Sequence, residues 1–354
     1  INRFVKEGTP GGARQVLGRI HRWPTWMWAN QEVRAMAEWL VERNARHPVE
    51  RRVGWYGLDV YSLWESMDLV VSYLDRVDPE AGRRARRAYE CFAPYGGEAE
   101  QYAYSIALSP DSCEESVVKA LLEVRRAGRE AIGSDRERAF FAEQNALIAR
   151  DAERYYRAMI RSGPHSWNVR DQHMTDTLDR LMEFHGPGAR AIVWAHNTHV
   201  GDARHTDMAE AGEFNIGQQV RERHADEGVV LVGFTTHQGT VIAGDGWGEP
   251  MRTMTVPPGR EGSFEDALHR VRADDQLMIF DRDATPPVLM TPRGHRAIGV
   301  VYRPEVERFG NYVPTVLPLR YDALLHIDRS HAVTPLPVAV DAAPEPPETY
   351  PTGA

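Results

Sequence analysis

Few features of this 354-residue sequence would staple it covalently or anchor it in a membrane. It has two cysteines, Cys91 and Cys113, and they do not form a C-x-x-C pair. A disulfide-stapled secreted domain and a structural zinc site are therefore not expected, and both residues are interpreted as ordinary thiols. No apolar run approaches the roughly 18–20 residues of a membrane span, so we expect no membrane partner. A cytoplasmic location is also expected.

Three well-known catalytic or nucleotide-binding motifs are also absent. The sequence has no G-x-S-x-G for a nucleophilic serine, no G-x-x-x-x-G-K-[ST] phosphate loop and no H-E-x-x-H metal motif. The glycine-rich stretch at 244–248 lacks the strand-turn-helix setting of a dinucleotide site. Three classes remain, namely histidine-based hydrolysis, a metal site, and ligand binding without chemistry. No cofactor is expected.

The charge balance argues against nucleic acid as a partner. The net charge is −9, whereas phosphate binding requires clustered lysine and arginine. The basic cluster at 83–87 lies beside acidic residues and is interpreted as a solvated helix face. Hydrophobic residues make up 42% of the chain, which is enough for one large domain or two moderate ones.

Helical periodicity dominates the first half of the chain. After an irregular segment at 1–30 and a helix at 31–44, a buried strand is predicted at 53–60. The region from 62 to 185 is predicted to be almost wholly helical. Ser62 and Glu65 form a capping-box pattern, and Asp78 precedes a proline at the first position of a helix. Further helices are expected at 111–126, 135–159 and 167–184.

Beyond residue 185 the pattern changes to short apolar runs of the kind found in buried parallel strands. Strands are predicted at 190–195, 228–235, 276–280, 297–302 and 323–327, with a helix at 216–224. We therefore predict an α/β fold, three-layer, with a mostly parallel sheet and a large helical insertion or subdomain. The predicted core is 1–61 with 186–335, the helical subdomain is 62–185, and the Pro-rich stretch 336–354 is a disordered tail.

The sharpest local feature is His196-Asn197-Thr198-His199, which directly follows the apolar run at 190–195. Ligands bind at the carboxyl ends of strands in α/β sheets, so both histidines are expected there, facing an open cleft. Two imidazoles at this spacing can act as a general base and an oxyanion donor, or as metal ligands. They can also simply cap the loop.

Two further segments carry polar groups toward the same expected cleft. Arg170 can hold a carboxylate or an oxyanion near its mouth, and Asp171 can orient a histidine. Alternatively, Asn168 caps a helix and Asp171 is favoured there by the helix dipole. Asp59 ends a predicted strand, where it either lines the cleft or caps the next helix.

Several of these segments together resemble the erythromycin esterase family. The motifs are Y-G-L-D-V-Y-S-L at 56–63, F-F-A-E-Q-N-A at 140–146, W-N-V-R-D-Q-H-M at 167–174, V-W-A-H-N-T-H at 193–199, G-F-T-T at 233–236 and A-I-G-V-V-Y-R-P at 297–304. They follow the family's order over roughly residues 1–335, which makes them more specific together than any one alone. The sequence resembles bacterial homologues of the family rather than its macrolide-resistance enzymes.

The resemblance implies a mostly parallel α/β core with a large helical part. It also implies hydrolysis of a lactone or other small-molecule ester by histidine-activated water, without a required metal. His199 falls on a family active-site position, with His196 beside it. We therefore take His199, His196 and Arg170 as candidate catalytic residues. The candidate substrate-binding residues are Asp59, Asp171 and Asn197.

One family segment has no counterpart in the sequence. The family's general base is a histidine in a G-E-x-x-H-G motif, and an active-site glutamate lies on the next strand. The stretch at 2–5 resembles the family's segment just after that strand. We therefore expect the sheet to lack its first two strands and the 354 residues to have little esterase activity. The alternatives are a non-catalytic or vestigial ligand-binding protein, and a metal hydrolase using His196, His199 and either Asp59 or Asp202.

Overall fold

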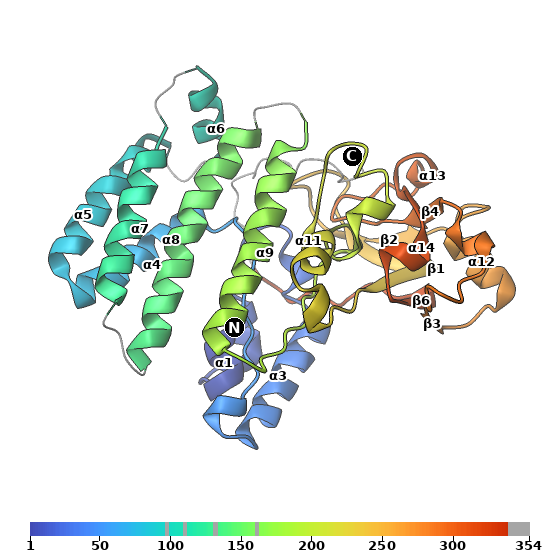
Figure 1. Ribbon diagram of the computed structural model, residues 1–354, viewed down its shortest axis with the longest axis horizontal. Coiled ribbons are helices and arrows are strands. Elements are labelled where there is room, and N and C mark those ends of the chain that lie inside the picture. The colour runs from blue at the N-terminus through green and yellow to red at the C-terminus, as the bar shows by residue number, and fades with distance from the viewer. Residues whose placement is uncertain (96–98, 109–111, 130–133, 160–162, 339–354) are drawn as a thin grey trace. The chain divides into compact units, whose positions relative to one another are not determined.

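The computed structural model describes residues 1–95, 99–108, 112–129, 134–159 and 163–338 (Figure 1). They form two compact units, one from Leu58–Val229 and one from Ile1–Gly57 with the described part of Val230–Ala354. The segment 186–229 therefore groups with the helices, not with the α/β core to which its sequence pattern assigned it. The expected tail lies outside the described residues except for 336–338. No helix in the described ranges combines the length and apolarity needed to cross a membrane.

The helical unit confirms the long helical region predicted from the sequence. Figure 1 shows α4, α5, α7, α8 and α9 running side by side. Its longer helices are α4 (Leu63–Val77), α5 (Pro79–Tyr89), α6 (Ala99–Leu108), α7 (Glu114–Gly128), α8 (Ser134–Met159), α9 (His165–His185) and α11 (Ile216–Arg223). Shorter turns are η3 (Glu90–Tyr95), α10 (Asn197–Val200), η4 (Ala203–His205) and η5 (Ala225–Glu227). The apolar stripes of α4, α5, α7 and α8 meet in one core that includes Val70, Leu121 and Leu147.

Helix starts in this unit were predicted with mixed success. Asp78 caps α5 as expected, because its carboxylate accepts hydrogen bonds from the backbone N–H groups of Glu80 and Ala81. The predicted capping box at Ser62 is not formed. Ser62 occupies the cap position of α4, but its hydroxyl bonds to the hydroxyl of Ser66 instead of to the backbone.

The two cysteines are joined in a disulfide, so their interpretation as separate thiols is wrong. Cys91 lies in η3 and Cys113 directly precedes α7, and the fold brings their Cα atoms to 5.9 Å. That distance falls within the range that a disulfide spans. The 22-residue separation in sequence carried no sign of this approach.

The second unit combines helices near its start with a small mixed sheet. Its helices are α1 (Asn2–Glu7), α2 (Gly12–Leu17), η1 (Thr25–Met27), α3 (Gln31–Ala45), η2 (Val49–Arg51), α12 (Phe264–Val271), η6 (Pro287–Met290), α13 (Glu307–Gly310) and α14 (Leu317–Arg320). Its strands are β1 (Val232–Ala243), β2 (Arg252–Val256), β3 (Gln276–Ile279), β4 (Arg293–Arg296), β5 (Tyr312–Thr315) and β6 (Ala323–Ser330). The larger sheet has the order β2-β1-β6-β3, and β4 pairs with β5.

The expected mostly parallel sheet is wrong for the described residues, although the mixed helix-and-strand character is as predicted. In the larger sheet β1 and β6 are parallel, whereas β2 and β3 each join it antiparallel. The predicted strands at 53–60, 190–195 and 297–302 are not strands. An extended apolar segment becomes a strand only when a neighbour completes its hydrogen-bond ladder, and no described segment does so at 190–195. Ile192 there is 98% exposed.

A buried carboxylate ties together three elements of the second unit. Glu265 of α12 is fully buried and accepts hydrogen bonds from the His295 ring at 3.0 Å and from the backbone N–H of Arg296 at 2.9 Å, both in β4. The hydroxyl of Thr235 in β1 also donates to it. Burial by itself raises the pKa of Glu265, but these donors outweigh it and hold the pKa at about 2.

We predict that Glu265→Gln lowers the free energy of unfolding by about 3 kcal/mol at pH 7, because it removes a buried carboxylate whose pKa is held at about 2 by three hydrogen-bond donors. The folded-state pKa of about 2 lies below the value of the unfolded chain. The stabilisation is therefore present above about pH 4.5 and is lost as the pH falls toward 2. Urea unfolding of both proteins at pH 7, 5 and 3 should show the difference shrinking between pH 5 and pH 3. The exposed Glu261→Gln is the matched control, and a difference independent of pH would contradict this account.

Candidate active site

His199 forms a close pair with a buried carboxylate in the helical unit. Its Nδ1 lies 2.9 Å from one carboxylate oxygen of Asp171 and 3.1 Å from the other. Trp167 stacks on the imidazole with 4.5 Å between ring centroids and 6° between planes. A neutral imidazole facing a carboxylate through Nδ1 carries its proton there, which leaves the lone pair on Nε2. The pair can therefore accept a proton at Nε2.

Asp171 is 0% exposed, and its charge is balanced from several directions. Burial raises the pKa of Asp171 above its usual value, although the hydrogen bond with His199 and the charge of Arg170 act in the opposite direction. The backbone N–H of Ile216, at the start of α11, donates to the same carboxylate at 3.1 Å. Asp171 thus connects α9, the His199 turn and α11.

The start of α11 is pressed against the histidine turn. Asn215 caps α11 and donates from its amide to the carbonyl oxygens of Thr198 and Gly201. A Cβ atom at Gly217 would lie 2.3 Å from the carbonyl oxygen of Val200, closer than real contacts allow. Glycine is therefore required at this position for α11 to approach the turn that carries His199.

Arg170 and Asp59, which the sequence offered as separate candidates, bind each other. The guanidinium donates from Nε and Nη2 to the two carboxylate oxygens of Asp59 at 3.0 and 2.8 Å. It also lies over the ring of Tyr61, 4.6 Å from the centroid. This bidentate geometry uses two N–H donors of the Arg170 guanidinium and fixes the side chain that directly precedes Asp171 in the chain. The Asp59 cap expected as an alternative is not formed on α4, whose cap residue is Ser62.

His196 and Asn197 begin the short helix α10. The Nδ1 of His196 accepts a hydrogen bond from the backbone N–H of Thr198 at 3.3 Å and lies 2.8 Å from its hydroxyl. The sequence left open that both histidines cap the loop. His196 does so, whereas His199 pairs with Asp171. Asn197 is half-buried. The expected location of both histidines at the end of a central strand is wrong, because 190–195 is not a strand.

The carboxylates proposed for a metal site are engaged by cations. Asp59 binds Arg170, and Asp202 accepts hydrogen bonds from Arg204 and Arg221. Across the described ranges no cluster of three or more His, Cys, Asp or Glu side chains has a geometry that could hold a metal ion.

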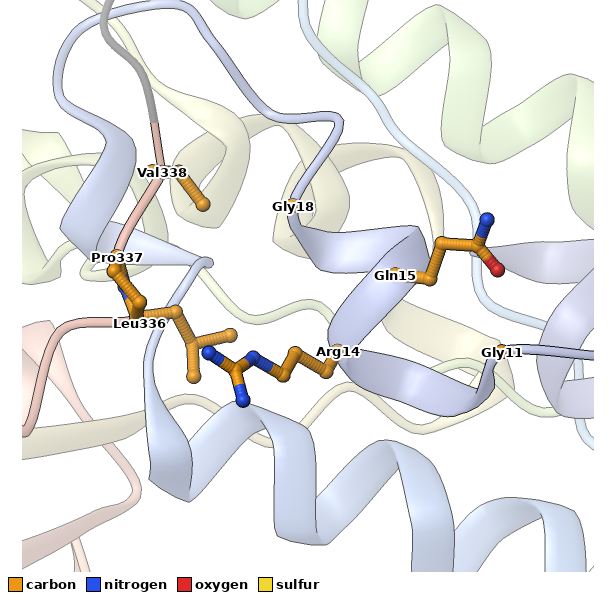
Figure 2. A pocket seen from close by; sticks show the side chains of 7 residues that line it. All are labelled: Gly11, Arg14, Gln15, Gly18, Leu336, Pro337 and Val338. Atoms are coloured by element: carbon orange, nitrogen blue, oxygen red, sulfur yellow. The ribbon is translucent and has the colours of Figure 1, made fainter.

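One cavity of about 470 Å³ lies beside α9 in the helical unit. It is lined by Glu114, Arg154, Arg157, Ala158, His165, Asn168, Val169, Gln172 and Phe214. Figure 2 shows another, of about 390 Å³, in the second unit between α2 and residues 336–338. Arg14 is its only charged lining residue, so that cavity contains no acid–base pair.

The structure adds one titratable residue that the sequence did not suggest. Glu213 is 6% exposed, and within the described parts of the chain its Oε2 atom has no hydrogen-bond partner. Asn168 lies inside α9 and does not cap it. Its amide holds the two neighbours of Glu213, because it accepts a hydrogen bond from the N–H of Phe214 and donates one to the carbonyl oxygen of Gly212. The pKa of Glu213 is raised to about 7, mainly by burial and further by the negative charges of Asp207 and Asp171. No sequence motif marks this loop position.

Comparison with known proteins gives one family and a consistent fold. The sequence matches the erythromycin esterase family over residues 1–330. A succinoglycan biosynthesis protein superposes with a TM-score of 0.70 at 21% identity, covering 94% of this chain and 77% of that one. A protein from Bacillus cereus gives 0.71 at 16% identity, covering 94% and 78%. A histidine-to-asparagine mutant of an erythromycin esterase in its open conformation gives 0.57 at 15% identity, covering 84% and 72%.

We predict that Glu213→Gln stabilises the protein at high pH and leaves its stability at pH 4.5 unchanged. A carboxyl with a folded-state pKa near 7 binds more protons when folded than when unfolded. Stability is therefore lost as the pH rises from about 4.5 to 7, by up to about 3 kcal/mol. Urea unfolding at pH 4.5 and 8.5 tests this, with the exposed Glu210→Gln as control. A variant that is equally or less stable than the wild type at pH 8.5 rejects the prediction.

Proposed function

Because the chain belongs to the erythromycin esterase family, we propose that it hydrolyses a small-molecule ester or lactone with water activated by a histidine. The observation that carries the proposal is the His199–Asp171 pair, 2.9 Å apart and held between α9 and α11. Family membership indicates a hydrolase. The bond that is cleaved and the mechanism are inferred from this pair.

In the proposed reaction, water attacks the ester carbonyl and gives a proton to Nε2 of His199. The imidazolium that forms is stabilised by the Asp171 carboxylate, which already faces Nδ1. The same proton then passes to the leaving alkoxide as the tetrahedral intermediate collapses. We assign the substrate contacts to Asn197, at the start of the same short helix, and to Arg170, whose guanidinium charge favours an oxyanion.

The cavity beside α9 supports binding of a small organic group in this unit. Its volume of about 470 Å³ lies within the usual range of ligand pockets. Val169 and Phe214 provide apolar lining, and Asn168 and Gln172 provide amides. Macrolides are one ligand class among many, since a fold family carries site and fold more reliably than substrate.

We predict that His199→Gln lowers kcat/KM by about 10³-fold or more and that Asp171→Asn lowers it by about 10²–10⁴-fold, because both remove the proton-accepting pair. Hydrolysis of p-nitrophenyl esters and of a panel of lactones is measured for the 354-residue chain and for a version extended at its N-terminus. The two versions are compared because the resemblance implies a histidine base in a motif that residues 1–354 do not contain, whereas the proposal assigns this role to His199.

The matched control is His196→Gln, which removes a capping ring in the same turn and is expected to lower the activity far less than His199→Gln. An extended protein whose activity is insensitive to His199→Gln would place the base outside these residues. No hydrolysis of any ester by the extended protein would favour ligand binding without chemistry.

A further inference from the structure

The cavity beside α9 in the helical unit carries more positive than negative charge on its wall. Among the described residues that line it, Arg154 and Arg157 are cationic, His165 can become so, and Glu114 alone is acidic. The chain as a whole has a net charge of −9, so the cavity differs in sign from the average of the protein. Positive charge in a concave wall attracts anions, because the low-dielectric surroundings focus its field.

Arg157 is held at the cavity wall by two carboxylates. Its Nε lies 2.9 Å from a carboxylate oxygen of the buried Glu153, and its Nη1 lies 3.1 Å from Glu114. Glu153 also accepts a hydrogen bond from the hydroxyl of Tyr102 at 2.8 Å. These contacts fix the guanidinium before a ligand arrives, which lowers the entropy cost of binding. They also offset its charge, so Arg157 alone would bind an anion only weakly.

Arg154 supplies the charge that Arg157 lacks. It lies three residues before Arg157 on α8, so the two side chains share one face of the helix. Arg154 is exposed, and within the described ranges no carboxylate pairs with it. Guanidinium groups bind the oxygens of carboxylates and phosphates through paired N–H donors. One fixed and one uncompensated arginine therefore face the same cavity.

Phe214 connects this cavity to the His199 site. It lines the cavity, and its carbonyl oxygen accepts a hydrogen bond from the indole of Trp167 at 2.8 Å. Trp167 in turn stacks on the imidazole of His199. A single side chain therefore lies between this part of the cavity wall and the proposed base.

We propose that Arg154 and Arg157 bind an oxyanion group of the substrate, a carboxylate or a phosphate, in this cavity. The molecule that is hydrolysed is then an ester or lactone that also carries a negative charge. This substrate class rests on the proposed hydrolase function, whereas the binding of an oxyanion by the two arginines does not. Binding and hydrolysis are therefore measured separately.

Binding is measured by isothermal titration calorimetry with adipate and with inorganic phosphate, and uncharged adipamide is the reference ligand. The test variant is Arg154→Gln, which removes an exposed side chain and leaves the buried Glu153 paired. Arg138→Gln is the matched control, because Arg138 is an exposed arginine of the same helix that does not line the cavity. Hydrolysis is measured with mono-4-nitrophenyl adipate and with its neutral methyl ester, in the 354-residue chain and in the extended version.

We expect adipate or phosphate to bind the wild type and Arg138→Gln equally, and Arg154→Gln to weaken this binding by about tenfold through the loss of a charged hydrogen-bond donor. The KM of the anionic ester should rise by the same factor in Arg154→Gln, and the KM of the neutral ester should not change.

Equal anion affinity of Arg154→Gln and the wild type would overturn the proposal, as would a wild type that binds neither anion. Anion binding that depends on Arg154, without hydrolysis of either ester, would reject the hydrolase and support the oxyanion site. Hydrolysis of both esters with equal KM and no anion binding would reject the oxyanion site and support the hydrolase.

Discussion

The candidate site depends on the cost of burying one carboxylate. Asp171 is inaccessible to water, and a buried charge is tolerated only when donors and opposite charges surround it. His199 and the N–H of Ile216 meet this need directly. These donors come from the turn that carries His199 and from the start of α11. The hydrogen bonds that stabilise the Asp171 carboxylate therefore also fix the imidazole relative to α9. Arg170, the residue just before Asp171, is fixed in turn by Asp59.

The close fit at the histidine turn also explains two sequence features that carry no catalytic group. Gly217 provides the space that α11 needs against the carbonyl of Val200. Asn215 caps α11 and bonds to the turn at the same time. Both residues position the turn that carries His199. A substitution at either is expected to act through the geometry of this turn.

The sequence predicted helices better than strands, for a physical reason. The helices of 62–185 satisfy their own backbone hydrogen bonds, so apolar periodicity and signals such as Asp78 with its following proline were sufficient. A strand depends on a partner that the local sequence does not contain. The apolar run at 190–195 looks like a buried strand, yet it has no ladder within the described residues, and Ile192 projects into solvent.

The sequence offered candidate site residues, and the structure shows which of them meet. Asp171 was expected to orient a histidine, and it pairs with His199. The pairing of Arg170 with Asp59 was not expected, because it depends on how α9 packs against the segment that precedes α4. Glu213 was missed because its environment, not its neighbours in sequence, raises its pKa.

The central claim is that Asp171 holds the proton of neutral His199 on Nδ1. Nitrogen-15 NMR of the imidazole at a pH where the ring is neutral measures this tautomer directly. The Nδ1–H form is predicted in the wild type and its loss in Asp171→Asn, whereas an Nε2–H tautomer in the wild type would contradict the account.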